Sequence, residues 1–140
     1  MSDERWAAVD RYITDNLIGP DAALDAALKA NAAAGLPAID VAPNQGKMLH
    51  LLARMQGARR ILEIGMLGGY STIWMARAMG EGGRLISLEL EQKHADVARE
   101  NLKRAGVGER VEVRVGPAAE SLPRLHEEGE GPFDMVFIDE

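Results

Sequence analysis

The 140-residue sequence contains no cysteine, which excludes a disulfide framework, a thiolate nucleophile and a metal site built on cysteine. No apolar run reaches membrane-spanning length, because charged residues interrupt the hydrophobic segments every few positions. The N-terminal stretch MSDERWAAVDRY carries acids where a signal peptide would carry basic residues. Together these absences predict a cytoplasmic protein that does not contact a membrane.

Positive charge is also scarce. Lys and Arg number 16 against 22 Asp and Glu, so the net charge is −6, and the basic residues are scattered along the chain. A protein that grips a nucleic-acid backbone usually presents a basic stripe, since phosphate contacts dominate that affinity. We therefore expect a small-molecule substrate and no nucleic-acid partner.

The first third of the chain has helical periodicity. A first helix is predicted over residues 3–18, with apolar positions at helical spacing. These positions are Trp6, Val9, Ile13 and Leu17. Asp21 can cap a second helix, which Gly35 closes, and residues 36–43 contain two prolines and no period, as expected of an extended connector. Asn44 can cap a third helix, whose apolar stripe consists of Met48, Leu51, Leu52 and Met55.

After Gly57 the pattern changes to short apolar runs that alternate with helical stretches. The runs cover residues 60–64, 84–88, 111–115 and 135–138, and the helical stretches cover about 70–79, 91–105 and 117–128. This alternation predicts right-handed crossovers and a parallel sheet. The expected fold class is α/β, a Rossmann-like parallel sheet in the order 3-2-1-4 with an N-terminal helical cap.

We expect one domain over residues 1–140. Residues 1–43 would form the helical cap and connector, and residues 44–140 the Rossmann-like core. The sequence ends at Glu140, directly after the fourth apolar run and without a helix to cover it. Because doubly wound sheets usually continue with further strands, we expect the domain to be truncated there, with its C-terminal strands missing.

The sharpest motif is LEIGMLGGYS, residues 62–71, which follows a predicted strand and opens a helix. Glycines at such a turn let the backbone approach a ligand and adopt positive φ. The spacing differs from the dinucleotide pattern G-x-G-x-x-G because position 67 is Leu, and Glu63 would repel a pyrophosphate. The motif favours a ligand with a cationic amino group. The alternative is a tight turn that binds nothing.

Three further segments follow strand ends. Glu89 closes the second strand, where an acid can accept both hydroxyls of a ribose, although it can equally be a solvated strand end. The small residues of VGPAA, 115–119, leave room for a flat base, or form a simple turn before a helix. Asp139 ends the fourth strand, where it can ligate a hard cation or face water.

Residues 36–140 resemble the cation-dependent O-methyltransferases of small molecules, the group that contains catechol and caffeoyl-CoA O-methyltransferases and many bacterial relatives. The matching segments are NQG (44–46), LEIGMLGGYS (62–71), SLELEQ (87–92), NLKRAG (101–106), VGPA (115–118) and FDMVFID (133–139). Their order and spacing make the resemblance specific.

This resemblance implies S-adenosylmethionine as cofactor and a divalent cation, Mg²⁺, as the second cofactor. It places Glu63 and the turn at Gly65 and Met66 at the methionine end of S-adenosylmethionine, with Ser71 assisting. The remaining cofactor contacts would be Glu89 at the ribose, the backbone of Ala118 at the adenine, Val41 from the connector, and Asp139. Asp139 would also be the first metal ligand. The catalytic lysine of the family and its further Asp-Asn metal ligands have no counterpart in this sequence, so no catalytic residue is assigned.

The expected activity is methyl transfer from S-adenosylmethionine to a hydroxyl of a small catechol-like aromatic molecule, by a homodimer. Two alternatives remain open: a fragment that binds the cofactor without turnover, and a nicotinamide-dependent oxidoreductase, which Leu67 and Glu63 disfavour. The three histidines, His50, His94 and His126, fall on separate predicted helices and indicate no metal site. We expect Gly65→Val to abolish cofactor binding at less cost to the fold than a truncation in the core.

Overall fold

A computed structural model describes residues 2–139, and Met1 and Glu140 lie outside the described residues. In chain order the elements are α1 (Asp3–Leu17), α2 (Ala22–Ala33), α3 (Pro43–Gln56), β1 (Arg60–Ile64), α4 (Tyr70–Ala78), β2 (Arg84–Glu89), α5 (Gln92–Arg104), η1 (Gly108–Arg110), β3 (Val111–Val115), α6 (Ala118–Glu127) and β4 (Met135–Ile138). Each predicted helix and strand is present, and the connector occupies residues 36–42. The short 3-10 helix η1 was not predicted.

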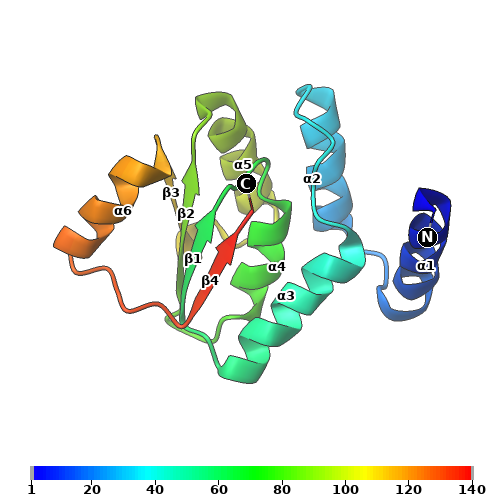
Figure 1. The fold of residues 1–140 in the computed structure, drawn as a ribbon, viewed down its shortest axis with the longest axis horizontal. Helices are drawn as coiled ribbons and strands as arrows, with labels where there is room; N and C mark the ends of the chain where they lie inside the picture. Colours follow the sequence, from blue (N-terminus) through cyan, green and yellow to red (C-terminus); the bar gives the residue numbers. More distant parts are fainter. Residues whose placement is uncertain (1, 140) are drawn as a thin grey trace.

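The strands form one parallel sheet in the order β3-β2-β1-β4. Ile61 of β1 lies opposite Leu85 of β2 on one side and Met135 of β4 on the other. The α/β fold class, the Rossmann-like topology and the strand order predicted from the sequence are therefore confirmed. Helix α6 lies on one side of the sheet, while α3, α4 and α5 lie on the other, with α2 beyond them (Figure 1).

The two faces of the sheet build two apolar clusters. Because side chains alternate along a strand, Ile61 and Leu85 join a large cluster beneath the helices on the α4 side. Leu62 and Ile86 point the other way and pack with Leu125 of α6. Parallel sheets are normally covered on both faces in this way, which explains why their strands appear as continuous apolar runs in the sequence.

The start of α2 matches its prediction and the start of α3 does not. Asp21 accepts a hydrogen bond from the Leu24 amide at 3.0 Å, so it caps α2 as expected. The prediction that Asn44 caps α3 was wrong, because α3 begins at Pro43 with Ala42 as its N-cap, two residues earlier than predicted. Proline presets the φ of a first helical residue and lacks the N–H that would need a partner there.

The apolar stripe of α3 does not face the core. Met48, Leu51, Leu52 and Met55 are all exposed. The buried face consists of Gly46, Leu49 and Ala53. A Cβ at Gly46 would overlap the indole of Trp74, so the small residues of this face let α3 pack closely against α4.

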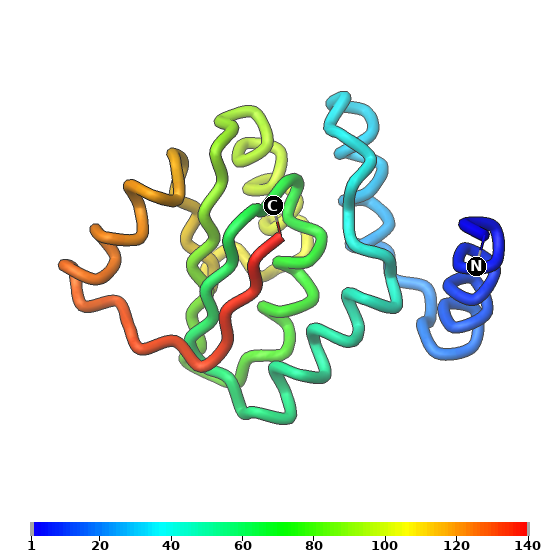
Figure 2. The backbone as a smooth tube through the Cα atoms, in the orientation of Figure 1, coloured from blue at the N-terminus to red at the C-terminus, as the bar shows by residue number. Residues whose placement is uncertain are grey.

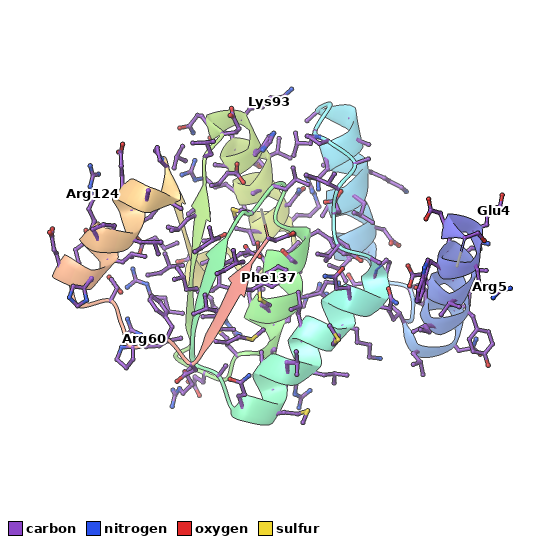
Figure 3. The ribbon with its side chains drawn as sticks, viewed as in Figure 1. Glu4, Arg5, Arg60, Lys93, Arg124 and Phe137 are labelled. Carbon is purple, nitrogen blue, oxygen red and sulfur yellow. The ribbon has the colours of Figure 1, made fainter. Side chains whose placement is uncertain are left out.

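Helix α1 buries none of its residues. The Asn44 amide donates to Asp10 at 2.9 Å, and the Lys47 ammonium donates to the Leu17 carbonyl at 2.5 Å, which attaches α1 to α3. Glu4 and Arg5 project from α1 away from the rest of the molecule (Figure 3). Within residues 2–139, no helix combines the length and the apolar character needed to cross a membrane.

The end of β4 returns to the turn that follows β1 (Figure 2). The Asp139 amide donates to the Ile64 carbonyl at 2.8 Å, and the Gly65 amide donates to the Leu88 carbonyl at 2.9 Å. The carboxyl ends of β1, β2 and β4 are thereby held side by side. In open α/β sheets this edge is where ligands bind.

Candidate functional site

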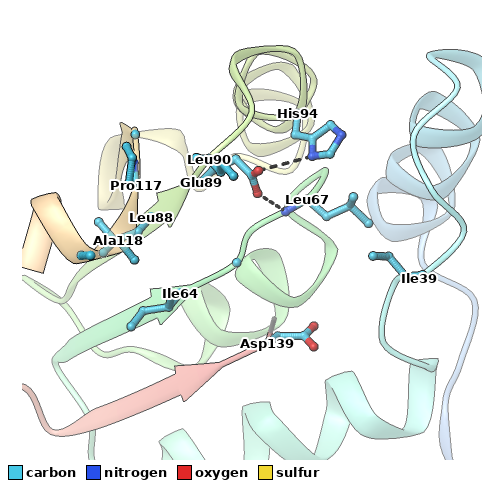
Figure 4. Close-up of a pocket in the computed structure, with 13 residues that line it drawn as sticks. Ile39, Ile64, Leu67, Leu88, Glu89, Leu90, His94, Pro117, Ala118 and Asp139 are labelled. Atoms are coloured by element: carbon cyan, nitrogen blue, oxygen red, sulfur yellow. Dashed lines mark hydrogen bonds and ion pairs between the residues drawn. The ribbon is translucent and has the colours of Figure 1, made fainter.

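A cavity of about 750 Å³ opens at the carboxyl ends of the strands (Figure 4). Its walls come from the turn after β1, the end of β2, the turn after β3 and the end of β4, with Ile39 of the connector at the side. The volume lies within the range typical of sites for small molecules and cofactors. Sequence-distant segments therefore build one ligand-sized site.

Glu89 lies at the centre of the hydrogen bonding in this cavity. One carboxylate oxygen, Oε2, accepts from the backbone amides of Met66 at 3.0 Å and Leu67 at 2.8 Å. The other, Oε1, accepts from the Glu91 amide at 2.9 Å and lies 3.3 Å from Nδ1 of His94. Glu89 thus holds the turn after β1 in place. Beyond the Glu91 amide, Oε1 has one further acceptor site, which is open to a ligand hydroxyl when His94 does not donate to it.

Glu63 is fully buried beneath α4 rather than in the cavity wall. Its carboxylate accepts three hydroxyl hydrogen bonds, from Ser71 and Ser87 at 2.6 Å and from Thr72 at 2.5 Å. Burial raises the pKa of Glu63 to about 7, and the three hydroxyls oppose that rise because they stabilise the charged form. The side chain therefore titrates near neutral pH.

Gly65 is the point at which the turn passes closest to β4. Its φ is +88°, a conformation that L side chains rarely adopt. A Cβ at this position would overlap the carbonyl of Asp139. Glycine is therefore required here by the backbone itself, before any ligand is considered.

Comparisons with known proteins identify the family to which a chain with this site belongs. The sequence profile of a family described as O-methyltransferase matches residues 20–140. The chain belongs to the O-methyltransferase family. "Catechol O-methyltransferase" of Niastella koreensis is 55% identical over 139 residues, which cover 99% of this chain and 63% of that protein. The protein of the same name from Mycobacterium tuberculosis is 58% identical over 131 residues, 94% of this chain and 58% of that protein.

Solved O-methyltransferase structures share the fold. The O-methyltransferase of Bacillus cereus in complex with SAH superposes with a TM-score of 0.94 at 57% identity, over 97% of this chain and 62% of that one. The O-methyltransferase TomG of Streptomyces achromogenes in complex with SAM gives 0.92 at 49% identity, over 100% of this chain and 63% of that one. The present chain thus spans about three fifths of the length of these relatives.

The cavity of this O-methyltransferase family member contains some of the residues that the sequence indicated. Those in its wall are Gly65, Glu89, Ala118 and Asp139. Those buried outside the wall are Val41, Glu63, Met66 and Ser71. Val41 and Met66 pack in the large apolar cluster, and Ser71 is occupied by Glu63. A direct ligand contact by this second group stays a prediction.

The sequence reasoning did not identify Ile39, Leu67 or His94, which also line the cavity. The three histidines lie on separate helices as expected, and His94 faces Glu89 across the cavity wall (Figure 4). The sequence position of His94 was the available signal, because His94 lies in the first turn of the helix that follows the strand ending at Glu89. The sequence did not indicate Ile39, because a connector with no helical or strand periodicity does not show which of its side chains faces the cavity.

The described residues do not form a metal centre by themselves. Asp139 is exposed at the cavity edge, and residues 2–139 contain no group of three or more His, Cys, Asp or Glu side chains placed to hold a metal ion. Divalent cations such as Mg²⁺ take several oxygen ligands. Asp139 can contribute one of them.

Proposed function

We propose that residues 1–140 act as one S-adenosylmethionine-binding domain of an O-methyltransferase for small hydroxylated aromatic molecules. The observation that carries the proposal is the cavity at the carboxyl ends of the strands, where the turn at Gly65 and the carboxylate of Glu89 face one space. Relatives named catechol O-methyltransferase and the neighbours solved with SAH or SAM support the choice of cofactor and reaction.

The residues of the cavity suit the parts of this cofactor. Glu89 Oε1 can accept a ribose hydroxyl in a charge-assisted hydrogen bond. Leu88, Pro117 and Ala118 offer apolar walls for the adenine, and the Gly65 backbone leaves room for the chain that ends in the amino acid. When bound, the cofactor supplies a sulfonium methyl group to an acceptor hydroxyl, and the task of this domain is to hold and orient it.

For the divalent cation we propose Asp139 as one ligand. Residues 2–139 contain no group of three or more His, Cys, Asp or Glu side chains placed to hold a metal ion, so we assign no catalytic step to a metal. The proposed contribution of the chain is to bind and orient S-adenosylmethionine at the carboxyl ends of the strands, with Asp139 as one ligand of the cation.

We expect the chain to bind S-adenosylhomocysteine, and Glu89→Ala to weaken that binding by roughly 1.5–3 kcal/mol, the scale of hydrogen bonds to a charged group. The loss has two sources, because the variant removes the acceptor for the ribose and also releases the Met66 and Leu67 amides. Isothermal titration with S-adenosylhomocysteine measures the effect.

Glu91→Ala is the matched control, since it removes a neighbouring exposed carboxylate that is not part of the cavity wall. Its affinity should equal that of the unaltered chain. A parallel titration with NAD tests the oxidoreductase alternative. Binding of NAD in preference to S-adenosylhomocysteine, or an unchanged affinity in Glu89→Ala, would contradict the proposal.

We also propose that the protein is a homodimer, joined through α1 and α3. Apolar side chains gather on the exposed faces of these two adjoining helices, and large exposed apolar patches usually mark contact surfaces. They are Trp6, Val9, Tyr12 and Leu17 on α1, and Met48, Leu51, Leu52 and Met55 on α3. Self-association would cover both helices at once.

Sedimentation equilibrium at micromolar concentration should show a dimer. Leu51→Glu should raise the dissociation constant at least about tenfold, because it places a charge in the proposed contact. Leu122→Glu on α6 is the control, since Leu122 is exposed to a comparable degree on the other side of the sheet. A monomer, or equal effects of the two variants, would count against the α1–α3 interface.

A further inference from the structure

Two buried asparagines connect parts of the molecule that the cofactor site needs together. Asn31 of α2 is 2% exposed and Asn101 of α5 is 1% exposed. The Asn101 amide donates to the Gly68 carbonyl at 2.8 Å and to the Asn31 side-chain oxygen at 3.0 Å. The Asn31 amide in turn donates to Asp40 of the connector at 2.8 Å. The chain of hydrogen bonds runs from the turn after β1 to the connector.

The direction of this chain is determined by its ends. The Gly68 carbonyl and the Asp40 carboxylate can only accept, so the nitrogen of each asparagine must point toward its end of the chain. The Asn101 oxygen is satisfied by Arg104, whose guanidinium donates to it at 2.8 Å. Each polar atom of the two amides is therefore used, and reversing either amide would place like groups together.

Gly68 is shaped for this arrangement. Its φ does not lie in the left-handed region, so the backbone alone does not require glycine. A Cβ at Gly68 would overlap the side chain of Asn31, however, so glycine is needed to admit the asparagine. One glycine of the LEIGMLGGYS motif therefore serves the cap helix, and Gly68 is not part of the cavity wall.

Both ends of the chain lie beside residues of the cavity. Leu67, next to Gly68, and Ile39, next to Asp40, line it from opposite segments. We propose that Asn31 and Asn101 are positioning residues that hold the connector and the turn after β1 at a fixed separation, and so set the width of the cofactor cavity. The inference rests on the proposed function, because its consequence is an effect on cofactor affinity by two residues that do not touch the cavity.

The test replaces the donor by an acceptor in the hydrogen bond from Asn31 to Asp40. Asn31→Asp sets two carboxylates against each other, and we expect it to weaken S-adenosylhomocysteine binding about tenfold, the scale of coupling within one hydrogen-bonded network. Adding Asp40→Asn restores a donor opposite the new carboxylate, so the double variant should return to within about threefold of the unaltered affinity. Asn16→Asp adds the same charge on exposed α1 and should leave the affinity unchanged.

Hydrogen exchange of the ligand-free chain gives a readout that does not depend on binding. Asn31→Asp should speed exchange both in residues 36–42 and in residues 65–69, and the double variant should reverse both changes. Faster exchange confined to α2, or a double variant that does not recover, would overturn the proposal. If the unaltered chain fails to bind S-adenosylhomocysteine, the proposed function fails, while the exchange data still decide whether the two segments are coupled.

Gly68→Ala tests the same link from the other end, by displacing Asn31 through steric overlap. The single variant should weaken S-adenosylhomocysteine binding about as much as Asn31→Asp does. The double variant Gly68→Ala/Asn31→Ala relieves the steric overlap but does not restore the hydrogen bonds of Asn31. Its affinity should therefore stay low while its melting temperature partly recovers. Full recovery of affinity in that combination would show that packing alone matters and would overturn the positioning role.

Discussion

Replacing Gly65 by valine should abolish binding of S-adenosylhomocysteine and lower the free energy of unfolding by about 3–5 kcal/mol, the range of severe single substitutions. The φ of +88° is strained for any L side chain and most of all for a β-branched one. The Cβ would also overlap the Asp139 carbonyl, which is backbone and cannot rotate away. The end of β4 must then move, and with it one wall of the cavity.

This expectation revises the one drawn from the sequence, which placed the cost on the ligand more than on the fold. Leu102→Ala provides the comparison, since truncation of a buried leucine typically costs 2–5 kcal/mol. Gly106→Val separates the contributions, because Gly106 has a φ of +74° with open space around it. Circular dichroism on urea denaturation, with titration of each folded variant, measures both effects. A Gly65→Val protein no less stable than Gly106→Val, and still able to bind, would refute the argument.

The arrangement of strands and helices could be predicted because it depends on patterns along the chain. Strands buried on both faces need continuous apolar runs, and the crossovers between parallel strands have one handedness. The positions of Glu89 and Asp139 followed from the same logic, since residues at the carboxyl ends of parallel strands meet at one edge. Both side chains line the cavity in the structure.

The roles within the glycine motif could not be predicted, because they depend on neighbours from other segments. As part of the glycine motif, Gly68 looked like a residue that makes room for a ligand. In the structure it makes room for Asn31, which lies 37 residues earlier in a helix whose sequence contains no motif. The apolar stripe of α3 was predicted from its helical spacing, but the spacing did not show what covers it, and the stripe is exposed. Apolar character shows that a face will be covered, but not whether the cover is the core of the chain or another molecule.

Glu63 is the clearest case of a residue whose partners could not be predicted from the motif that contains it. An acid two residues before Gly65 suggested a partner for a cationic ligand, while in the structure three hydroxyls surround it. Strand periodicity contained part of the answer, since Glu63 shares its face with Ile61 beneath α4. Ser71 and Thr72, in the first turn of the next helix, were the remaining signal that its partners come from within the protein.

We expect Glu63→Gln to remove a loss of stability that the unaltered chain suffers as the pH rises. The folded pKa of Glu63 is about 7 against an ordinary value of 4.5, so between these values the folded state binds more protons than the unfolded state. Stability contributed by the neutral form is thus complete below pH 4.5 and is lost as the pH rises to about 7. The difference in pKa corresponds to about 3 kcal/mol.

Urea denaturation between pH 4.5 and 8 should therefore show the gap in unfolding free energy, Glu63→Gln minus unaltered chain, growing by about 3 kcal/mol in favour of the variant. Glutamine has the same shape and keeps one oxygen for the surrounding hydroxyls, so the gap reports the charge. Glu127→Gln, at an exposed position of α6, controls for the loss of a carboxylate and should show a constant gap. Asp139→Asn provides a second check, because the charge of Asp139 contributes to the raised pKa of Glu63 and its removal should move the window toward lower pH. A gap for Glu63→Gln that is independent of pH would mean that Glu63 remains charged throughout, with the three hydroxyls outweighing its burial.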